Sequence, residues 1–486
     1  MHRFLHAFMA TASLFATTLT ARAVSAQPQQ AIDSLALLRH VRALAHDSMG
    51  GRANGSAGQR RAADYIVAEL QRLGLEPIAS TGSYLQPVPL TRVSVARDAA
   101  RLVLIRGIRA DTIAGTQFHQ FGGDSVAFRA FSGRTMHVGT LGPDAPRVLD
   151  TRMPRGKVVI ADAAPGVPLD DVIMKLERQG AAGLILAVGD SARYLALRHA
   201  RGEDRFFVRG GVDAPVARRL PVLLASPAAG RSLRTRLFAP GSGRASDTSA
   251  TLRLEIAPRF SPVETSNIVA RLPGRDPARR DTAVILSAHY DHIGFARPVD
   301  GDSLYNGLID NAVGVAALLG IAEAMRTSPP DRSVIFLFTT AEEEGSLGSA
   351  YYTTRPTLPL ARMRAAINVD AGAPLAPPNS WFIESGGDSL ISAAALAAAT
   401  SRGWTVEIAP AQANSDHWSF HIRGIPIAFP VPGEGWEGVT TAQEEQLIAR
   451  WWRFHRPDDQ WSPDFPLAGL ARHAEFIMAL ARELAG

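Results

Sequence analysis

The sequence of 486 residues contains no cysteine, so it can hold neither a disulfide bond nor a cysteine-ligated metal. Lysine is almost absent, and arginine supplies nearly all of the positive charge, with 51 Lys and Arg residues against 46 Asp and Glu. The formal net charge is only +5, and no basic stripe interleaved with aromatic residues is found, which argues against nucleic-acid binding. With 46% hydrophobic residues, the composition indicates an ordinary folded protein of two or three domains.

Long apolar runs are also missing outside the N-terminus. Residues 1–26 have the features of an export signal, because His2 and Arg3 precede a stretch of apolar and small residues and Val24-Ser25-Ala26 suits a cleavage site. We therefore expect an exported protein that is periplasmic or extracellular. After removal of the signal we expect no stable membrane insertion, because no other run is long enough to span a bilayer.

Strands and helices alternate in the second half of the chain. Continuous apolar runs predict buried strands, and Ala- and Leu-rich segments between them predict helices. This pattern predicts an α/β fold in which a mostly parallel sheet is sandwiched by helices. The expected strands are 283–287, 334–338, 365–369 and 425–429, and the expected helices are 311–325, 390–398 and 467–484.

The first half divides into two parts of different character. Residues 27–115 include two amphipathic helical segments on either side of a glycine-rich loop at 50–58, and we assign them to the N-terminal part of a catalytic domain. Residues 116–256 alternate strand-like runs with loops and offer no concentrated set of metal-binding groups, which indicates a smaller, β-rich inserted domain. Residues 257–486 then form the main part of the catalytic domain.

Acidic residues and histidines gather at the ends of the predicted strands. They occur in His289-Tyr290-Asp291-His292, at Asp310, in Glu342-Glu343-Glu344 and at Asp370, and His455 follows near the C-terminus. In open α/β sheets, ligands bind outside the carboxyl ends of the strands. Imidazole nitrogens and carboxylate oxygens are the ligands that zinc takes, and two zinc ions can share a carboxylate. The pattern therefore predicts a site for two zinc ions.

Several of these residues also have an ordinary structural explanation when taken alone, although Asp370 at the end of a buried strand needs a partner. Asp310 could cap the helix that follows it. The acidic run that begins at Glu342 could be a first helical turn stabilised by the helix dipole. His417 and His455 could be surface histidines. It is the combination of residues that favours a metal site.

The same combination resembles the zinc exopeptidase family of bacterial leucyl aminopeptidases and glutamate carboxypeptidases. The family pattern is met in order by His289-Tyr290-Asp291, the Asn306 to Asp310 turn, Glu342-Glu343-Glu344-Gly345, Asn368-Val369-Asp370 and the segment from Phe454 to Asp459. Residues 116–256 look like a protease-associated domain. The resemblance implies a zinc aminopeptidase-like fold with this domain inserted.

The resemblance also implies a role for each residue. Asp310 would bridge two zinc ions, with His289 and Asp370 completing one site and Glu343 and His455 the other. The expected catalytic residues are Glu342, as the general base for the bridging water, and Asp291, as the partner of the His289 ring. We expect Asp416 and His417 to contact substrate or to support the ligands.

The implied reaction is hydrolysis of a peptide bond at a chain end, and peptides are the expected substrates. An aminopeptidase fits best, because metal ions and nearby carboxylates can anchor a free α-amine. A carboxypeptidase or dipeptidase of the same fold would use arginines to bind the substrate carboxylate, and this chain has many. A glutaminyl cyclase and a catalytically inactive scaffold are the remaining alternatives. The sequence does not indicate an oligomeric state.

Overall fold

The computed structural model extends over the full chain, and it describes a defined set of residues. The predicted export signal, 1–26, lies outside this set. The described residues are 32–78, 80–95, 100–114, 118–121, 131–150, 152–191, 193–194, 205–209, 220–237, 246–255, 258–370, 376–433, 436–451 and 453–486.

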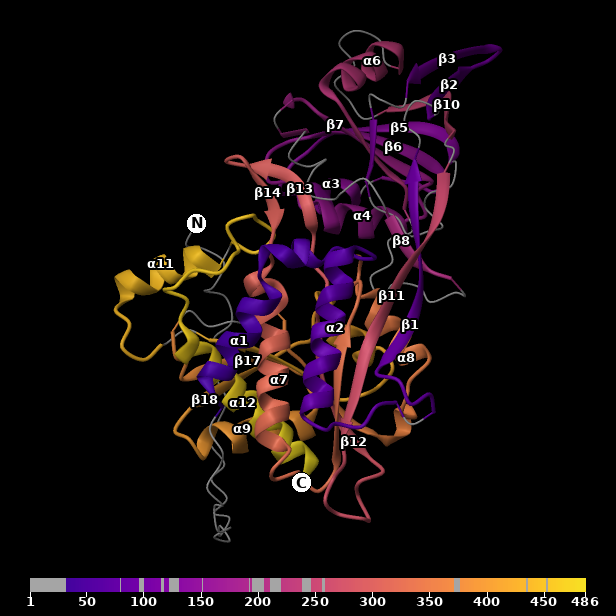
Figure 1. The fold of residues 1–486 in the computed structure, drawn as a ribbon. Coiled ribbons are helices and arrows are strands. Elements are labelled where there is room, and N and C mark those ends of the chain that lie inside the picture. Colours follow the sequence, from indigo (N-terminus) through magenta and orange to yellow (C-terminus); the bar gives the residue numbers. More distant parts are fainter. Residues whose placement is uncertain are drawn as a thin grey trace. The chain divides into compact units, whose positions relative to one another are not determined.

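The larger sheet has nine strands within the described part of the chain (Figure 1). Its centre is parallel, as predicted, because β12 pairs in parallel with β15 and β16, and β16 with β19. Long antiparallel strands extend one side, so the sheet as a whole is mixed. In spatial order the strands are β18 (Thr405–Ala409), β17 (Ser380–Glu384), β19 (Ile427–Pro432), β16 (Met363–Asn368), β12 (Ala283–His289), β15 (Ser333–Thr339), β11 (Pro258–Leu272), β1 (Leu85–Val95) and β8 (Arg205–Val208).

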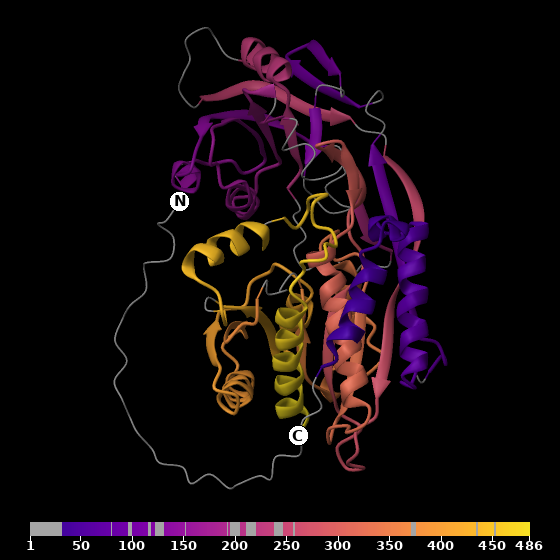
Figure 2. The ribbon, with the colours of Figure 1, turned by 60° about the vertical axis from the view of Figure 1, so that its left-hand side comes forward.

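Helices cover both faces of this sheet, as the continuous apolar strands predict. In the described part of the chain, one face packs against five helices (Figures 1 and 2), and the other contacts two shorter helices. Alternate residues of β12 and β15 enter the two separate cores, since successive strand side chains point to opposite faces. The five helices are α1 (Ser34–Leu44), α2 (Ala57–Arg72), α7 (Val313–Met325), α9 (Ser389–Thr400) and α12 (Leu467–Ala485), and the two shorter ones are α8 (Leu347–Thr354) and α10 (His417–His421).

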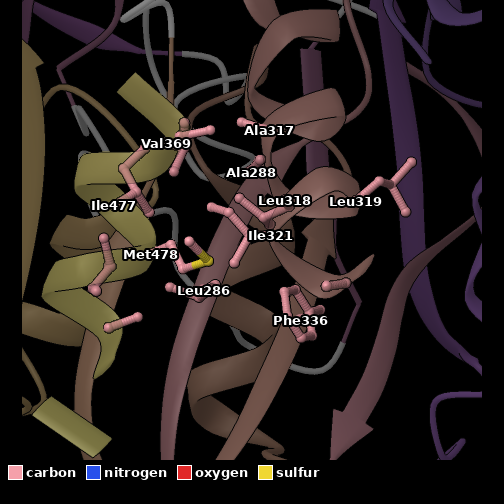
Figure 3. Close-up of a cluster of buried hydrophobic side chains, with 14 of the residues drawn as sticks. Leu286, Ala288, Ala317, Leu318, Leu319, Ile321, Phe336, Val369, Ile477 and Met478 are labelled. Carbon is pink, nitrogen blue, oxygen red and sulfur yellow. The ribbon is translucent and has the colours of Figure 1, made fainter. Parts of the chain in front are cut away.

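Helix α7 is the central helix of the larger core. Figure 3 shows Leu318 and Ile321 of this helix close to Leu286 of β12 and Met478 of α12. The segment Leu308–Met325 is long and apolar enough to cross a membrane, but 94% of it is buried inside the protein. Such burial is what the core helix of a globular domain shows, so its hydrophobicity is explained by packing. A π-helical turn, η3 (Leu308–Ala312), precedes α7 and carries Asp310 into the site.

A second sheet has eight strands in the described residues, and it has its own apolar clusters. Its strands β5, β6, β7 and β9 pair in parallel, and antiparallel strands flank them. The likeness to a protease-associated domain stays a prediction. In spatial order the strands are β3 (Arg109–Ala114), β2 (Arg101–Arg106), β10 (Ser246–Glu255), β5 (Ser132–Leu141), β6 (Lys157–Ala163), β7 (Gly183–Val188), β9 (Val222–Ala225) and β4 (Phe118–Phe121), with helices α3 (Ala145–Asp150), α4 (Leu169–Arg178) and α6 (Pro227–Leu237).

The remaining elements lie in connections between the strands and helices of the nine-stranded sheet. The hairpin of β13 and β14 separates β12 from the turn that carries Asp310. These elements are the 3-10 helices η1 (Asp47–Arg52) and η4 (Leu360–Arg362), strands β13 (Gly294–Val299) and β14 (Asp302–Tyr305), and helix α11 (Thr441–Trp451).

Candidate metal centre

The carboxyl ends of three neighbouring parallel strands bring acidic and imidazole side chains together. His289 is the last residue of β12, and it lies in register with Thr339, the last residue of β15. Glu342 and Glu343 follow β15 by three and four residues, and Asp370 follows β16 by two. These residues meet at one edge of the sheet because β12, β15 and β16 run in the same direction.

Two groups of possible metal ligands form at this edge. Within each group, one donor atom of every residue lies within 4.8 Å of those of the others. Both groups combine imidazole nitrogen with carboxylate oxygen, which is the donor set that zinc prefers in a protein without cysteine. The first group is His289, Glu342 and Asp370, and the second is His292, Asp310, Glu343 and His455.

Asp310 belongs to the second group, but one of its two oxygens faces His289 of the first group. Its Oδ1 is 3.0 Å from Nε2 of His289, whereas its Oδ2 is 2.9 Å from Nε2 of His455. The same His289 nitrogen lies 3.0 Å from Oδ1 of Asp370, and the same His455 nitrogen lies 3.0 Å from Oε2 of Glu343. This arrangement is what a carboxylate shared by two ions requires.

The negative charge of the carboxylates in these groups favours the binding of cations. Burial lowers the pKa of His455, but hydrogen bonds to Asp310 and Glu343 outweigh burial and raise it to about 11. Burial also opposes the charge on His289, yet Asp370 and Asp310 hold its pKa well above the ordinary value. Protons on these rings thus balance the buried carboxylates when no metal is bound. Divalent cations would displace them, so metal binding should release protons.

The carboxylates respond to the same neighbours. Burial raises the pKa of Asp310, but hydrogen bonds from His289 and His455 outweigh it and hold the pKa well below its ordinary value. Burial and Asp310 both raise the pKa of Glu343, whereas His292 and His455 lower it more, to about 2. Both carboxylates are therefore ionised at neutral pH and ready to bind a cation. The donor chemistry and the charge of the site fit a pair of zinc ions.

Glu342 differs from its neighbour Glu343, because its carboxylate makes no ion pair with a histidine among the described contacts. Its Oε1 accepts a hydrogen bond from Oγ of Ser346 at 3.3 Å. Burial raises its pKa well above the ordinary value; the charge of His289 opposes this shift, and Asp370 adds to it. A carboxylate with a raised pKa next to a cation site is a better proton acceptor than an ordinary one, as a general base requires.

Asp291 supports the site through the backbone. Its Oδ1 accepts from the backbone N–H of Glu342 at 3.2 Å, and its Oδ2 accepts from Nδ2 of Asn54 at 3.1 Å. The expected contact with the His289 ring differs in detail: Nδ1 lies 3.2 Å from the backbone oxygen of Asp291 but 3.8 Å from its carboxylate. The carboxylate is drawn to the two N–H donors, so the carbonyl oxygen is left as the acceptor for the ring.

Asp416 and His417 lie outside both groups of possible ligands. Asp416 is fully buried and accepts a short hydrogen bond from Oγ1 of Thr339. His417 is also fully buried; its ring stacks on Phe429 at 4.7 Å, and its Nε2 lies 3.0 Å from the backbone oxygen of Gln412. Their burial leaves them without an exposed surface for a substrate, and a supporting role for Asp416 stays a prediction.

The structure adds residues to which the sequence pattern gave no role. Ser415 donates a short hydrogen bond to Oδ2 of Asp370, beside the predicted pair of Asp416 and His417. His292 belongs to the second ligand group, and its place in the His289 segment was a signal that could have identified it. Asp459 accepts from the backbone N–H of Ile309 at 2.9 Å and so holds the turn that carries Asp310.

Comparison with known sequences gives the same picture for the second half of the chain. Residues 267–481 match the profile of Peptidase family M28. The chain is 25% identical over 223 residues to aminopeptidase YwaD of Bacillus subtilis, which covers 45% of this chain and 44% of that protein. It is 32% identical over 97 residues to a vacuolar membrane protease of Vanderwaltozyma polyspora, which covers 20% of this chain and 9% of that protein. The matches thus span less than half the length of these curated relatives.

Solved structures share the fold over nearly the whole chain. An aminopeptidase from Aneurinibacillus sp. strain AM-1 superposes with a TM-score of 0.56 at 17% identity, covering 93% of this chain and 94% of that one. BSAP, a zinc aminopeptidase from Bacillus subtilis, superposes with a TM-score of 0.51 at 17% identity, covering 92% and 94%. This likeness establishes the fold. The sequence match, which covers residues 267–481, shows similarity to Peptidase family M28.

Proposed function

We propose that this protein is a zinc-dependent aminopeptidase that removes residues from the free amino ends of peptides. The observation that carries the proposal is the position of Asp310, with one carboxylate oxygen directed toward His289 and the other toward His455. The family match of residues 267–481 and the similarity to YwaD, which is named an aminopeptidase, support it.

The residues present would hold two zinc ions. Asp310 would be shared, His289 and Asp370 would complete one site, and Glu343 and His455 the other. Bound there, zinc would supply the Lewis acidity that makes a peptide carbonyl carbon more electrophilic.

Glu342 is the proposed general base. As a water oxygen attacks the scissile carbonyl carbon, the Glu342 carboxylate takes up the proton that the water loses. It then delivers this proton to the peptide nitrogen as the carbon–nitrogen bond breaks, so that the leaving group departs as an amine. Burial raises the pKa of Glu342 well above its ordinary value, which favours uptake of the proton that the water loses.

The charge of the site favours an amino end over a carboxyl end. Two zinc ions would neutralise the four carboxylates of the ligand groups. The buried carboxylates of Asp291 and Asp416 beside them leave an excess of negative charge, which would attract an α-ammonium group and repel an α-carboxylate. Arg52 acts electrostatically on Asp310, Asp291 and Glu343, but it is buried and donates hydrogen bonds to four backbone carbonyls. It is therefore not available to bind a substrate carboxylate as a carboxypeptidase would require.

Export from the cytoplasm is also part of the proposal. The sequence features of 1–26 support an exported enzyme, and sequencing the N-terminus of protein recovered outside the cytoplasm would test this. A mature chain that begins near Gln27 is the expected result. A retained Met1 would contradict removal of the predicted signal, and recovery from the cytoplasm alone would contradict export.

The activity is tested by giving the purified protein two kinds of substrate. Aminoacyl-p-nitroanilides have a free amino end, whereas N-blocked peptides have a free carboxyl end alone. Turnover of the first kind only, with about two zinc ions per chain and loss of activity on chelation, is the expected result. Cleavage of N-blocked peptides from the carboxyl end would establish a carboxypeptidase instead. Full zinc content without hydrolysis of either kind would overturn the peptidase proposal.

A further inference from the structure

His292 occupies a position from which it can control a single predicted metal ligand. It follows His289 by three residues, and its side chain is only 1% exposed. Its Nδ1 lies 2.6 Å from Oε1 of Glu343, but 3.9 Å from Oδ2 of Asp310. The other oxygen of Glu343, Oε2, faces His455 at 3.0 Å. The two oxygens of Glu343 thus have different partners, one of which is His292.

The hydrogen-bond environment decides which ring nitrogen of His292 carries the proton. Among the described residues its Nε2 is buried without a hydrogen-bond partner. A proton on Nε2 would leave a buried donor unsatisfied and would turn the lone pair of Nδ1 toward the carboxylate of Glu343. A proton on Nδ1 leaves only a lone pair without a partner, which costs less than a buried N–H group without one. Nδ1–H therefore donates to Oε1 of Glu343.

The His292 ring is held in place from several sides. Its backbone N–H donates to the backbone oxygen of Arg52 at 3.3 Å. A Cβ atom at Gly307 would come within 2.5 Å of the ring, so the turn leading to Asp310 packs directly on it. The ring of His455 lies 5.8 Å away, measured between centroids. A ring confined in this way offers its donor to Glu343 in one fixed direction.

We propose that His292 is a positioning residue that, by donating from Nδ1 to Oε1 of Glu343, directs Oε2 into the second zinc site. This inference rests on the zinc centre of the proposed function but not on the reaction. It follows that His292 sets the zinc affinity of the site formed by Asp310, Glu343 and His455. The site formed by His289 and Asp370 depends on it much less.

Two substitutions separate this role from direct ligation and from a structural role. His292→Asn keeps an N–H donor close to the position of Nδ1, whereas His292→Leu fills similar volume without a donor. In chelator-stripped protein titrated with zinc against a competing chelator, we expect His292→Leu to weaken one of two sites by about 10–100-fold, the usual cost of losing such a partner. We expect His292→Asn to retain most of the affinity at that site.

A matched control uses the same substitution at another buried histidine. His473 is also 1% exposed, and its Nδ1 accepts a hydrogen bond from Nε1 of Trp381 at 3.0 Å. His473→Asn should leave both zinc affinities unchanged. Thermal unfolding of each stripped variant shows whether the fold is intact before zinc is added, so a loss of zinc affinity can be assigned to the site.

The outcomes distinguish the inference from the proposed function. Equal weakening by His292→Leu and His292→Asn would show that His292 binds the metal itself, and no weakening by either would show that it does not position Glu343. Either result overturns the inference while peptide hydrolysis by the unchanged protein continues. A third outcome would overturn the proposed function alone. In it, the unchanged protein binds two zinc ions and His292→Leu weakens one site more than His292→Asn does, but the unchanged protein hydrolyses no peptide.

Discussion

Arg52 donates a hydrogen bond from Nε to the backbone oxygen of Tyr290 at 2.9 Å, although the two residues are 238 positions apart. The other guanidinium nitrogens donate to the backbone oxygens of Leu44, Asn306 and Gly307. One buried side chain thereby joins η1, the segment after His289 and the turn before Asp310. Burial lowers the pKa of Arg52 to about 10, so the group stays charged at neutral pH.

Replacing Arg52 by lysine should damage both stability and metal binding. A lysine ammonium cannot reproduce the planar fan of donors, so some of the four carbonyl oxygens would lose their partner. Each buried acceptor left without a partner costs about 1–3 kcal/mol. We expect Arg52→Lys to lower the free energy of unfolding of the zinc-free protein by at least about 2 kcal/mol and to weaken zinc binding, as measured by urea unfolding and zinc titration.

The control for this prediction is Arg60→Lys. Arg60 is exposed and donates one hydrogen bond to the backbone oxygen of Gly55 at 3.1 Å. Its replacement should change the free energy of unfolding by less than about 0.5 kcal/mol, as is usual at the surface. Similar losses in both variants would show that Arg52 does not organise the site.

Arg52 also shows what sequence reasoning misses. The glycine-rich loop at 50–58 was recognisable, but nothing in it indicates that its arginine reaches two distant turns. By contrast, the rule that ligands bind at the carboxyl ends of strands was enough to bring His289, Glu342 and Asp370 together. Each lies at the end, or within three residues of the end, of a strand with a continuous apolar pattern. Local pattern thus predicts which residues end neighbouring parallel strands, but it cannot predict contacts made through long connections.

Asp310 and His455 were identified in the sequence as candidate ligands, but strand ends do not explain their positions. Asp310 is separated from β12 by the β13–β14 hairpin, and His455 lies in a connection with a positive φ of 61°. No periodicity places either of them, and the family resemblance alone implied their roles. The sequence also did not predict that Arg205–Val208 pairs with β1 in antiparallel fashion. Four residues carry too little hydrophobic pattern to identify a partner strand.

Glu342→Gln should separate metal binding from catalysis. Glutamine has nearly the same shape and can still accept from Ser346, but it cannot take up a proton. We expect zinc content to be retained and kcat for an aminoacyl-p-nitroanilide to fall by about 10²–10⁴-fold, the usual contribution of a general base. Glu344→Gln, the same change two residues on, should keep most of the activity. Turnover by Glu342→Gln equal to that of Glu344→Gln would remove Glu342 from the mechanism.

Gly307→Ala tests how closely the turn before Asp310 packs on His292. A Cβ there would lie 2.3 Å from the backbone oxygen of Asp310 and 2.5 Å from the His292 ring. Gly403 also has a positive φ, 70° against 61°, but a Cβ there would meet nothing within 4 Å. The control Gly403→Ala therefore carries a similar backbone strain without the clash.

The difference between the two glycine variants reports the clash alone. We expect Gly307→Ala to lower the free energy of unfolding by about 1–3 kcal/mol more than Gly403→Ala, the usual cost of overpacking. It should also weaken the zinc site of Asp310 and Glu343, since the His292 ring must move to make room. Equal stabilities and equal zinc affinities for the two variants would contradict the packing described for Gly307.

His473 predicts a measurable acid sensitivity that is independent of the metal. Burial lowers its pKa from 6.5 to about 3. As the pH falls through 6.5, the unfolded chain therefore takes up a proton on this ring that the folded chain takes up only near pH 3. The free energy of unfolding of zinc-free protein should fall from this group alone by about 1.4 kcal/mol per pH unit over most of that range. In His473→Asn, which can still accept from Trp381, urea unfolding between about pH 7 and pH 4 should show a slope smaller by this amount. Parallel pH profiles for the two proteins would show that the buried ring is protonated in the folded state.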